Sequence, residues 1–305
     1  MSGEVIGPGT IELPAGGIPV LRLPLRSLFD QRAQRLNALS EGHSLGGYLR
    51  FLAAIARAQH DALDLVHDVP LPDADTLRYC REHGLPPLSI HGWSRAPAWR
   101  TVLRRLVAVV AAEELPEAAR TAAEYLGGVD DGKLEDLAAQ MLSGDLAQVD
   151  RAAAAFLAAA LQVYWLHMAA TLPADLVALP QVAHLCPVCA SEPVASIVRI
   201  GSAEHGLRYL CCSLCATEWH EVRIKCPYCQ STRGISYYGI EGSSGAVKAE
   251  DCESCGSYLK ILYMEKDPAV EAVADDIASV ALDVLMAGQG IARSGVNFFL
   301  LGGSA

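Results

Sequence analysis

Four Cys-x-x-Cys pairs constrain the fold of this chain more than any other feature of its sequence. Residues 190–211 separate the first and second pairs, and residues 230–251 separate the third and fourth, so the two spacers are equal in length. The second set, KCPYCQS…CESC, repeats the first set, LCPVCAS…CSLC, cysteine for cysteine. This internal repeat indicates two copies of one structural unit. The eight cysteines are Cys186, Cys189, Cys212, Cys215, Cys226, Cys229, Cys252 and Cys255.

Each copy has the spacing of a four-sulfur metal site. Two thiolates separated by two residues sit at a tight turn, and a hairpin returns a second such turn to complete a tetrahedron. Units of this size have no core of their own, so a bound metal is expected to hold each one together. Zinc and iron both accept four thiolates, and the spacing does not choose between them. The expected strands are 194–200, 207–210 and 219–224 in the first copy, and 235–240, 246–250 and 259–264 in the second.

Other uses of the cysteines are less consistent with the pattern. CPYC also resembles the redox motif of glutaredoxins, but that chemistry needs the motif at the start of a helix that follows a strand. A disulfide framework is uncommon in a cytoplasmic protein. Cys80 is expected to be a buried thiol. Cys211 lies one residue off the register of the repeat and is expected to be a spectator, with an exposed reactive thiol as the alternative. His205 and His220 are not needed as ligands.

Helical periodicity dominates the chain as far as Pro180. Apolar stripes at i, i+3, i+4 and i+7 begin at Leu45 and at Trp99, the second preceded by Ser94 as an expected N-cap and Pro97 in the first turn. Ala/Leu-rich segments near 117–126, 131–143 and 145–171 continue the pattern. After Asp267 a further apolar stripe predicts one helix that ends at Gly288 or Gly290. Its members are Val270, Val273, Ile277, Val280, Ala281 and Val284.

These patterns predict an α+β multidomain protein. The chain has 305 residues, which allows two or more domains. We expect an N-terminal multi-helical domain, two tandem rubredoxin-like or zinc-ribbon metal modules, and a C-terminal helix with a tail. The expected boundaries are 1–183 for the helical domain, 184–224 and 225–266 for the two modules, and 267–305 for the C-terminal helix and tail.

The stretch GHSLGG, residues 42–47, matches the nucleophile-elbow pattern G-x-S-x-G of lipases and esterases. An elbow serine needs a strand leading into it, whereas the polar helical pattern DQRAQRLNALSE precedes it here. No alternation of strands and helices is present to place a matching acid and histidine. We therefore predict that Ser44 is the N-cap of a helix, and no catalytic residue is expected.

One segment has the length of a membrane span. Residues 152–172 carry no formal charge, but they are rich in alanine and contain Gln162 and His167. A buried helix of the helical domain is therefore expected, and no membrane insertion. The beginning of the chain, MSGEVIGPGTIELPAGG, has no basic region followed by an apolar one, so we expect no secretory signal and a cytoplasmic location.

Charge argues against nucleic acid as a partner. The net charge is -11, and phosphate-backbone binding needs a surplus of Lys and Arg. Between residues 186 and 264, seven basic residues stand against eight acidic ones, before any thiolate is counted. Tyr228, Tyr237 and Tyr238 could stack on bases, but half-buried strand positions explain them equally well. A protein-binding role fits the charge better.

With the four pairs in place, the chain resembles the formate dehydrogenase accessory protein family, FdhE. The resemblance lies in the cysteine pairs and in segments spread along nearly the whole chain. It implies a cytoplasmic protein that binds two iron ions through the eight cysteines named above. Two departures are Cys211, where relatives are expected to have histidine, and Ser44, where they are expected to have proline. The segments are LGGYLRFLAAIARAQ, PPLSIH, LCPVCASEPVASIVRIG, GLRYL, TEWHEVRIKC, LKILYMEKDPAVEAVADDIAS and VNFFLLGG.

The resemblance also implies a function. Members of the family are needed for active respiratory formate dehydrogenase and are expected to engage its catalytic subunit before twin-arginine export. The leading hypothesis is therefore a non-enzymatic maturation factor. A redox-active assembly enzyme acting on the same client is the first alternative, and a nucleic-acid-binding ribbon protein is the second. The sequence leaves the oligomeric state open, with self-association as a further possibility.

Overall fold

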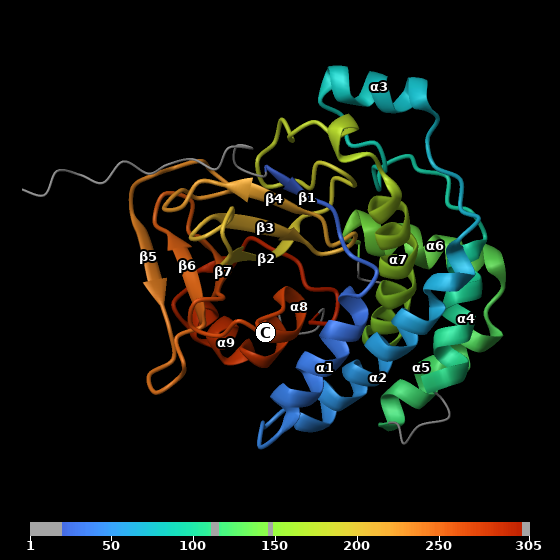
Figure 1. Ribbon diagram of the computed structural model, residues 1–305. Coiled ribbons are helices and arrows are strands. Elements are labelled where there is room, and N and C mark those ends of the chain that lie inside the picture. The colour runs from blue at the N-terminus through green and yellow to red at the C-terminus, as the bar shows by residue number, and fades with distance from the viewer. Residues whose placement is uncertain (1–19, 111–115, 146–148, 301–305) are drawn as a thin grey trace, which may run out of the picture.

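The computed structural model describes residues 20–110, 116–145 and 149–300. The N-terminal segment in which no secretory signal is expected lies outside these residues, and so do residues 146–148 of the helix expected over 145–171. The helices of the first part of the chain lie on one side of the molecule, and the strands lie on the other side together with the C-terminal helices (Figure 1). The helices of the first part of the chain are α1 Leu28–Ser40, α2 Gly46–Ala62, α3 Ala74–His83, α4 Ala98–Val110, α5 Glu117–Gly128, α6 Asp131–Ser143 and α7 Arg151–Thr171, with 3-10 turns η1 Leu63–Val66 and η2 Ala174–Leu176.

Helix α7 is the central helix of the helical domain. The helices α2, α4, α5 and α6 pack against it, and Asp150 caps its start by accepting a hydrogen bond from the backbone N–H of Ala153 at 2.9 Å. By its length and composition α7 is long and apolar enough to cross a membrane. However, 94% of its most apolar 18-residue stretch is buried inside the protein. The predicted buried helix is confirmed.

The start of α2 differs from the sequence prediction. Leu45 occupies the N-cap position and no side chain caps the helix, so the prediction that Ser44 is the N-cap is wrong. His43 contacts the residue at the N-cap position without capping the helix: one of its ring nitrogens accepts from the Leu45 N–H at 3.0 Å, and the other lies 2.9 Å from the Ala278 carbonyl oxygen. The N-cap prediction for Ser94 is also wrong, because α4 begins only at Ala98, directly after Pro97.

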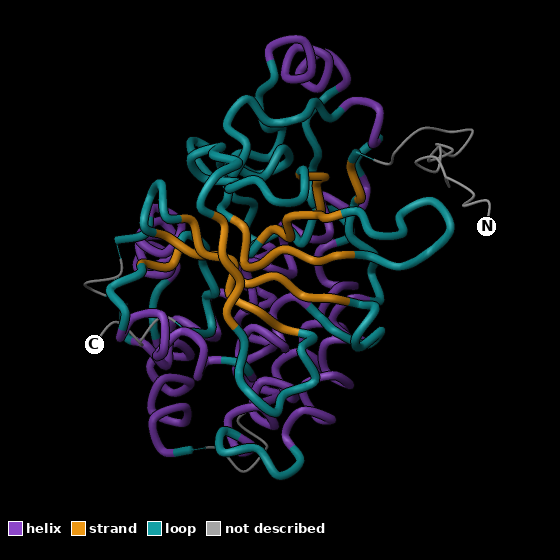
Figure 2. Tube along the Cα trace, turned by 90° about the vertical axis from the view of Figure 1, so that its left-hand side faces the viewer, coloured by secondary structure: helices purple, strands orange, loops and turns teal. Residues whose placement is uncertain are grey.

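The two predicted ribbons are present, and they join into one sheet. Each contributes three antiparallel strands, and β2 pairs with β7 in parallel to connect the two ribbons. The order across the sheet is β1-β4-β3-β2-β7-β6-β5, with β8 beside β7. The sheet curves so that its two halves run in different directions (Figures 1 and 2). The strands are β1 Leu21–Arg22, β2 Pro193–Val198, β3 Arg208–Cys212, β4 Glu218–Glu221, β5 Ile235–Tyr238, β6 Val247–Cys252, β7 Ser257–Tyr263 and β8 Ala292–Arg293.

The prediction of a single C-terminal helix from the apolar stripe is wrong, although the predicted end at Gly288 is confirmed. The segment forms two helices, α8 Ala272–Ala278 and α9 Val280–Gly288, which meet at Ser279. The Ser279 hydroxyl donates to the Asp275 carbonyl oxygen at 2.7 Å, which competes with continuation of the helix. Both Asp275 and Asp276 belong to α8, and they pair with Arg35 of α1 and Lys260 of β7. Asp283 of α9 pairs with Lys260 and with Arg293 of β8. Val284 is 68% exposed.

A buried polar network connects the helical domain to the sheet. The Arg32 guanidinium on α1 donates to the Glu271 carboxylate at 3.0 Å and to the Gln162 side-chain oxygen at 3.2 Å. Gln162 in turn donates from its amide nitrogen to the Ser213 carbonyl oxygen at 2.8 Å. Ser213 lies inside the second cysteine pair, so the central helix α7 is bonded directly to that pair.

Two neighbouring glycines at the start of α2 provide a test of this packing. A Cβ atom added at Gly46 would lie 2.6 Å from the Ser40 backbone oxygen, whereas one added at Gly47 would meet nothing within 4 Å. We expect Gly46→Ala to lower the free energy of unfolding by about 1–3 kcal/mol, because α1 and α2 would have to move apart. Gly47→Ala should be neutral or stabilise by up to about 1 kcal/mol. Chemical denaturation measures the free energy of unfolding of both variants. Equal effects of the two substitutions would contradict the close approach of Gly46 to the Ser40 backbone oxygen.

Candidate metal centres

The eight paired cysteines form two separate groups of four. In each group the four sulfur atoms all lie within 4.8 Å of one another. The Sγ–Sγ distance is 3.4 Å for Cys189 and Cys212, and 3.8 Å for Cys226 and Cys255. A regular tetrahedron of sulfurs about 2.3 Å from a central ion has edges of about 3.8 Å. We call these groups site 1, which is Cys186, Cys189, Cys212 and Cys215, and site 2, which is Cys226, Cys229, Cys252 and Cys255.

The chemistry of the donors fits a metal ion. All ten cysteines are free thiols, so no disulfide competes for these sulfurs. Burial raises the pKa of the Cys186 and Cys212 thiols. Burial also opposes ionisation of Cys189, but hydrogen bonds from the other thiols of site 1 hold its pKa well below its usual value. Four thiols packed this closely need a cation before all of them can ionise, and both groups are able to hold one.

The same turn recurs at all four cysteine pairs. The residue after the second cysteine of each pair has a left-handed backbone, with φ between 59° and 67°. Its N–H donates to the carbonyl oxygen of the first cysteine in three of the pairs, for instance from Ala190 to Cys186 at 2.9 Å. Amide groups also point at sulfur, as from Leu214 N–H to Cys212 Sγ at 3.4 Å. The four left-handed residues are Ala190, Ala216, Gln230 and Gly256.

Only one of these four positions is glycine. A left-handed conformation costs a non-glycine residue roughly 1–2 kcal/mol, so three of the turns are held in place by their surroundings. Sequence reasoning missed this feature, because alanine and glutamine give no signal of a left-handed turn.

Site 1 lies in the interior, between the helical domain and the sheet. All four of its cysteines are buried. The loop before α4 bonds to its first pair: Leu88 N–H donates to the Val188 oxygen at 2.8 Å, and Ile90 N–H donates to the Cys189 oxygen at 2.9 Å. Together with the bond from Gln162 to Ser213, these contacts tie both cysteine pairs of site 1 to the helical domain.

Site 2 lies nearer the surface. Cys229 is exposed and Cys255 is half-buried. The Cys226–Cys229 pair begins no helix, so it does not have the setting that the glutaredoxin-type redox motif requires. The Tyr228 ring packs at a tilt against the His184 ring of the other module, with their centroids 4.7 Å apart. A residue inside the first pair of site 2 therefore contacts a residue just before the first pair of site 1.

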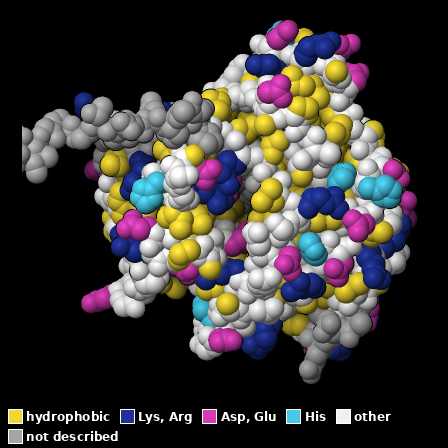
Figure 3. Space-filling view, viewed as in Figure 1, with side chains coloured by type: hydrophobic (Ala, Val, Ile, Leu, Met, Phe, Trp, Pro, Cys, Tyr) yellow, Lys and Arg dark blue, Asp and Glu magenta, His cyan; other side chains and the backbone are white. Residues whose placement is uncertain are grey.

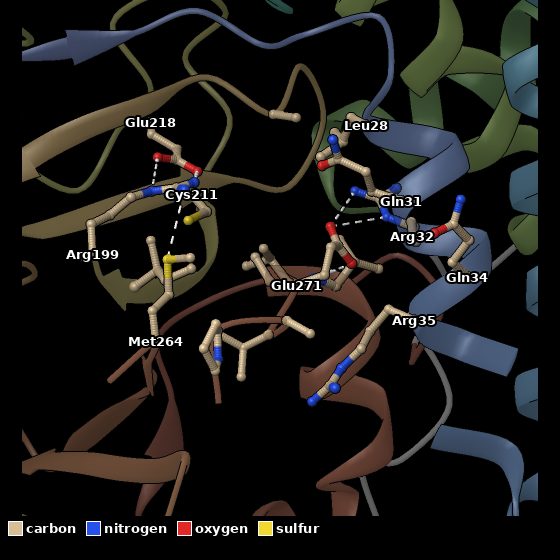
Figure 4. A pocket seen from close by; sticks show the side chains of 18 of the residues that line it. Leu28, Gln31, Arg32, Gln34, Arg35, Arg199, Cys211, Glu218, Met264 and Glu271 are labelled. Atoms are coloured by element: carbon tan, nitrogen blue, oxygen red, sulfur yellow. Dashed lines mark hydrogen bonds and ion pairs between the residues drawn. The ribbon is translucent and has the colours of Figure 1, made fainter. Parts of the chain in front are cut away.

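The two remaining cysteines lie outside both sites. Cys80 is buried in α3, as expected. Neighbouring residues of a strand point to opposite faces, so Cys211 points away from site 1 while Cys212 points into it. Cys211 lies in a cavity of about 500 Å³ between α1, the strands β2 and β3, and the segment 264–273 (Figure 4). It is buried, and burial raises the pKa of its thiol, so the alternative of an exposed reactive thiol is wrong.

The same cavity contains residues that sequence reasoning missed. Arg32, Arg35 and Arg199 line it, and each is paired with a carboxylate, so the wall carries no unbalanced cation (Figure 4). Isolated arginines and acids far apart in the sequence give no sign of such pairing. His205 and His220 belong to neither metal site.

Comparison with known protein families covers most of the chain. The family models "FdhE, N-terminal", "FdhE, central domain" and "FdhE, C-terminal domain" match residues 18–180, 185–223 and 224–300. The "Protein FdhE homolog" of Enterobacter sp. (strain 638) is 45% identical over 290 residues, which are 94% of this chain and 92% of that protein. The "Protein FdhE" of Salmonella enteritidis PT4 (strain P125109) is 44% identical over 290 residues, with the same coverage of both chains.

A solved structure is also similar. The crystal structure of the FdhE protein from Pseudomonas aeruginosa superposes with a TM-score of 0.83 at 38% sequence identity. The match covers 94% of this chain and 100% of that one.

The different burial of the two sites predicts different rates of metal loss. We expect a chelator to remove the ion of site 2 at least tenfold faster than the ion of site 1, because the chelator can reach site 2 at the exposed Cys229 sulfur. Native mass spectrometry follows the ions over time. Cys229→Ser should abolish the fast phase and leave the helical content unchanged, whereas the matched Cys189→Ser should lower the thermal midpoint of the whole protein. Equal rates of metal loss at the two sites would contradict the assignment of site 2 as the more accessible site.

Proposed function

Since the chain belongs to the FdhE family, we propose that it is a non-enzymatic accessory protein that acts in the cytoplasm on respiratory formate dehydrogenase. In this proposal it binds the catalytic subunit of that enzyme and is required for its assembly or activity. The observation that carries the proposal is the match of all three family domains in order, from residue 18 to residue 300, with both cysteine groups intact.

We further propose that both sites hold iron. Each offers four thiolate sulfurs at tetrahedral spacing, which is the donor set of a rubredoxin-type iron centre. Amide N–H groups near the sulfurs, such as that of Val188 at 3.4 Å from Cys186 Sγ, stabilise the negative charge of such a centre. In this role the ions hold the two ribbons in shape, and the protein surface does the binding.

The surface charge supports a protein client over a nucleic acid. Lys and Arg side chains alternate with Asp and Glu side chains on the face shown in Figure 3 and do not gather into a basic area. Several basic side chains of the sheet are engaged with acids, for example Arg199 with Glu218. Phosphate-backbone binding needs free cations in a continuous stripe.

A redox-active assembly enzyme is the second candidate, and one observation favours it. The exposed Cys229 brings one ligand sulfur of site 2 to the surface, where a client could exchange electrons with the ion. Under this candidate the ion would cycle between two oxidation states, with an external reductant supplying the electron.

Co-purification tests the leading proposal. The affinity-tagged chain should retain the formate dehydrogenase catalytic subunit, and a deletion strain should lose most formate oxidation until the chain is restored. A variant with serine at both Cys226 and Cys229 tests whether site 2 is needed. Failure of the wild-type chain to bind the subunit, together with normal formate oxidation in the deletion strain, would contradict the proposal. Rescue only by a chain whose ion undergoes reversible reduction would favour the second candidate.

A further inference from the structure

The cavity that contains Cys211 lies where three parts of the molecule meet. These parts are helix α1, the first ribbon, and the segment that leads from β7 into α8 (Figure 4). Ligand sites in proteins have volumes of about 300–1,000 Å³ and occur preferentially where domains meet. With about 500 Å³, this cavity is within that range. We call it the α1–ribbon cavity, and its lining residues fall within 28–38, 194–218 and 264–273.

The α1–ribbon cavity has a buried apolar floor and an open mouth. Ile197 of β2 and Cys211 of β3 are buried, and they belong to the floor. The exposed lining residues belong to α1 and to the segment opposite it, for instance Ala38 on α1 and Pro268 and Ala269 on the segment. A small molecule can therefore enter between α1 and residues 268–269 and reach the apolar floor.

Two arginines in the wall of this cavity are held in the same way. Arg199, which follows β2, donates from Nε to one oxygen of Glu218 at 2.9 Å and from Nη2 to the other oxygen. Arg35 of α1 donates from Nε to one oxygen of Asp275 at 2.9 Å and from Nη2 to the other oxygen at 2.5 Å. In both pairs the carboxylate occupies Nε and Nη2, which leaves Nη1 for a further acceptor.

Neither Nη1 group has a strong acceptor. That of Arg199 has Met264 Sδ at 3.8 Å, and a thioether sulfur is a weak acceptor. That of Arg35 donates to no group within the described parts of the chain. The paired carboxylates fix both guanidinium planes, so these donors are already oriented. Arg199 comes from the sheet side and Arg35 from α1, so hydrogen-bond donors lie on two walls (Figure 4).

The charges around the cavity are balanced. Arg32, a third arginine in the wall, is also neutralised, because it donates to Glu271 at 3.0 Å. A charged ligand would therefore lose its hydration without gaining an unpaired countercharge. An uncharged ligand loses less hydration, and a carbonyl oxygen is a suitable acceptor for the Nη1 groups.

We propose that the α1–ribbon cavity binds an uncharged organic molecule with an apolar body and at least one carbonyl oxygen. The apolar body lies against the floor at Ile197 and Cys211, and the carbonyl oxygen accepts a hydrogen bond from Nη1 of Arg199 or Arg35. The bound molecule touches all three parts that meet here and so stabilises their junction. This site goes beyond the proposed function, which assigns only metal ions and a protein client.

Fluorescence titration of the metal-loaded, full-length protein tests the proposal. The probe is Prodan, an uncharged naphthalene with one carbonyl group, whose emission responds to polarity and to hydrogen bonding. We expect one molecule to bind per chain with a Kd below about 100 µM, with emission at a shorter wavelength than in water. Anilinonaphthalene sulfonate, an anion of similar size, should bind at least tenfold more weakly. Binding of this anion as tight as that of Prodan would overturn the assignment of an uncharged ligand.

A matched pair of variants tests whether the probe occupies this cavity. Ala38 lines the mouth, whereas Asn37 is also exposed on α1 but lies about 100° around the helix and does not line the cavity. Ala38→Trp should fill the mouth and weaken Prodan binding at least tenfold, and Asn37→Trp should leave it unchanged. Circular dichroism checks that both variants fold. Prodan binding by folded Ala38→Trp as tight as that of the wild type would overturn the proposal.

Replacement by lysine tests the two arginine donors. Lysine keeps the charge beside the carboxylate but removes the Nη1 group. Prodan has a single carbonyl, so we expect one of the variants Arg35→Lys and Arg199→Lys to weaken its binding at least fivefold and to shift its emission to a shorter wavelength. Unchanged affinity and emission in both folded variants would overturn the assignment of the arginines as donors to the ligand.

Discussion

Closure of four sulfurs around one point at site 1 is the constraint on which the rest of the structure depends. The two cysteine pairs of this site lie at the same end of the hairpin formed by β2 and β3, and each is bonded to a different part of the helical domain. The first pair bonds to the loop before α4, and the second receives the Gln162 side chain of α7. Metal binding there therefore couples the ribbon to the helices, and binding energy becomes folding energy. Without an ion, four thiols would be buried within 4.8 Å of one another.

Buried charge pairs add to the connection between the helical domain and the sheet that site 1 makes. Arg35 on α1 bonds to Asp275 at 2.5 Å and to Asp267 at 2.7 Å, and Lys260 of β7 bonds to Asp276 at 3.1 Å. Both members of the Lys260–Asp276 pair are fully buried. Such pairs add little net stability over apolar contacts, but removal of one member leaves a buried charge and is costly. We infer that these pairs set where α8 sits, against α1 and β7.

Sequence and structure agree best where the chemistry is local. The Cys-x-x-Cys spacing reports a turn of a few residues, so the grouping of eight cysteines and the strands around them could be predicted from it. The long apolar run of α7 likewise indicated a buried helix. Contacts between distant parts of the chain give no such local sequence signal. The parallel contact of β2 with β7 and the bonds of Arg32 are of this kind, since they join residues that are distant in sequence. The contact of His43, which precedes α2, with the Ala278 carbonyl oxygen likewise joins residues far apart in the sequence.

The most direct test of this account is metal analysis combined with an optical spectrum of protein purified without added metal. The account predicts two ions per chain, both iron, with the visible absorption of ferric four-thiolate centres after exposure to air. Two zinc ions and no visible absorption would contradict the assignment of iron. A folded, stable protein with fewer than one ion per chain and eight titratable thiols would contradict the central claim that the thiolate sites hold the two halves of the molecule together.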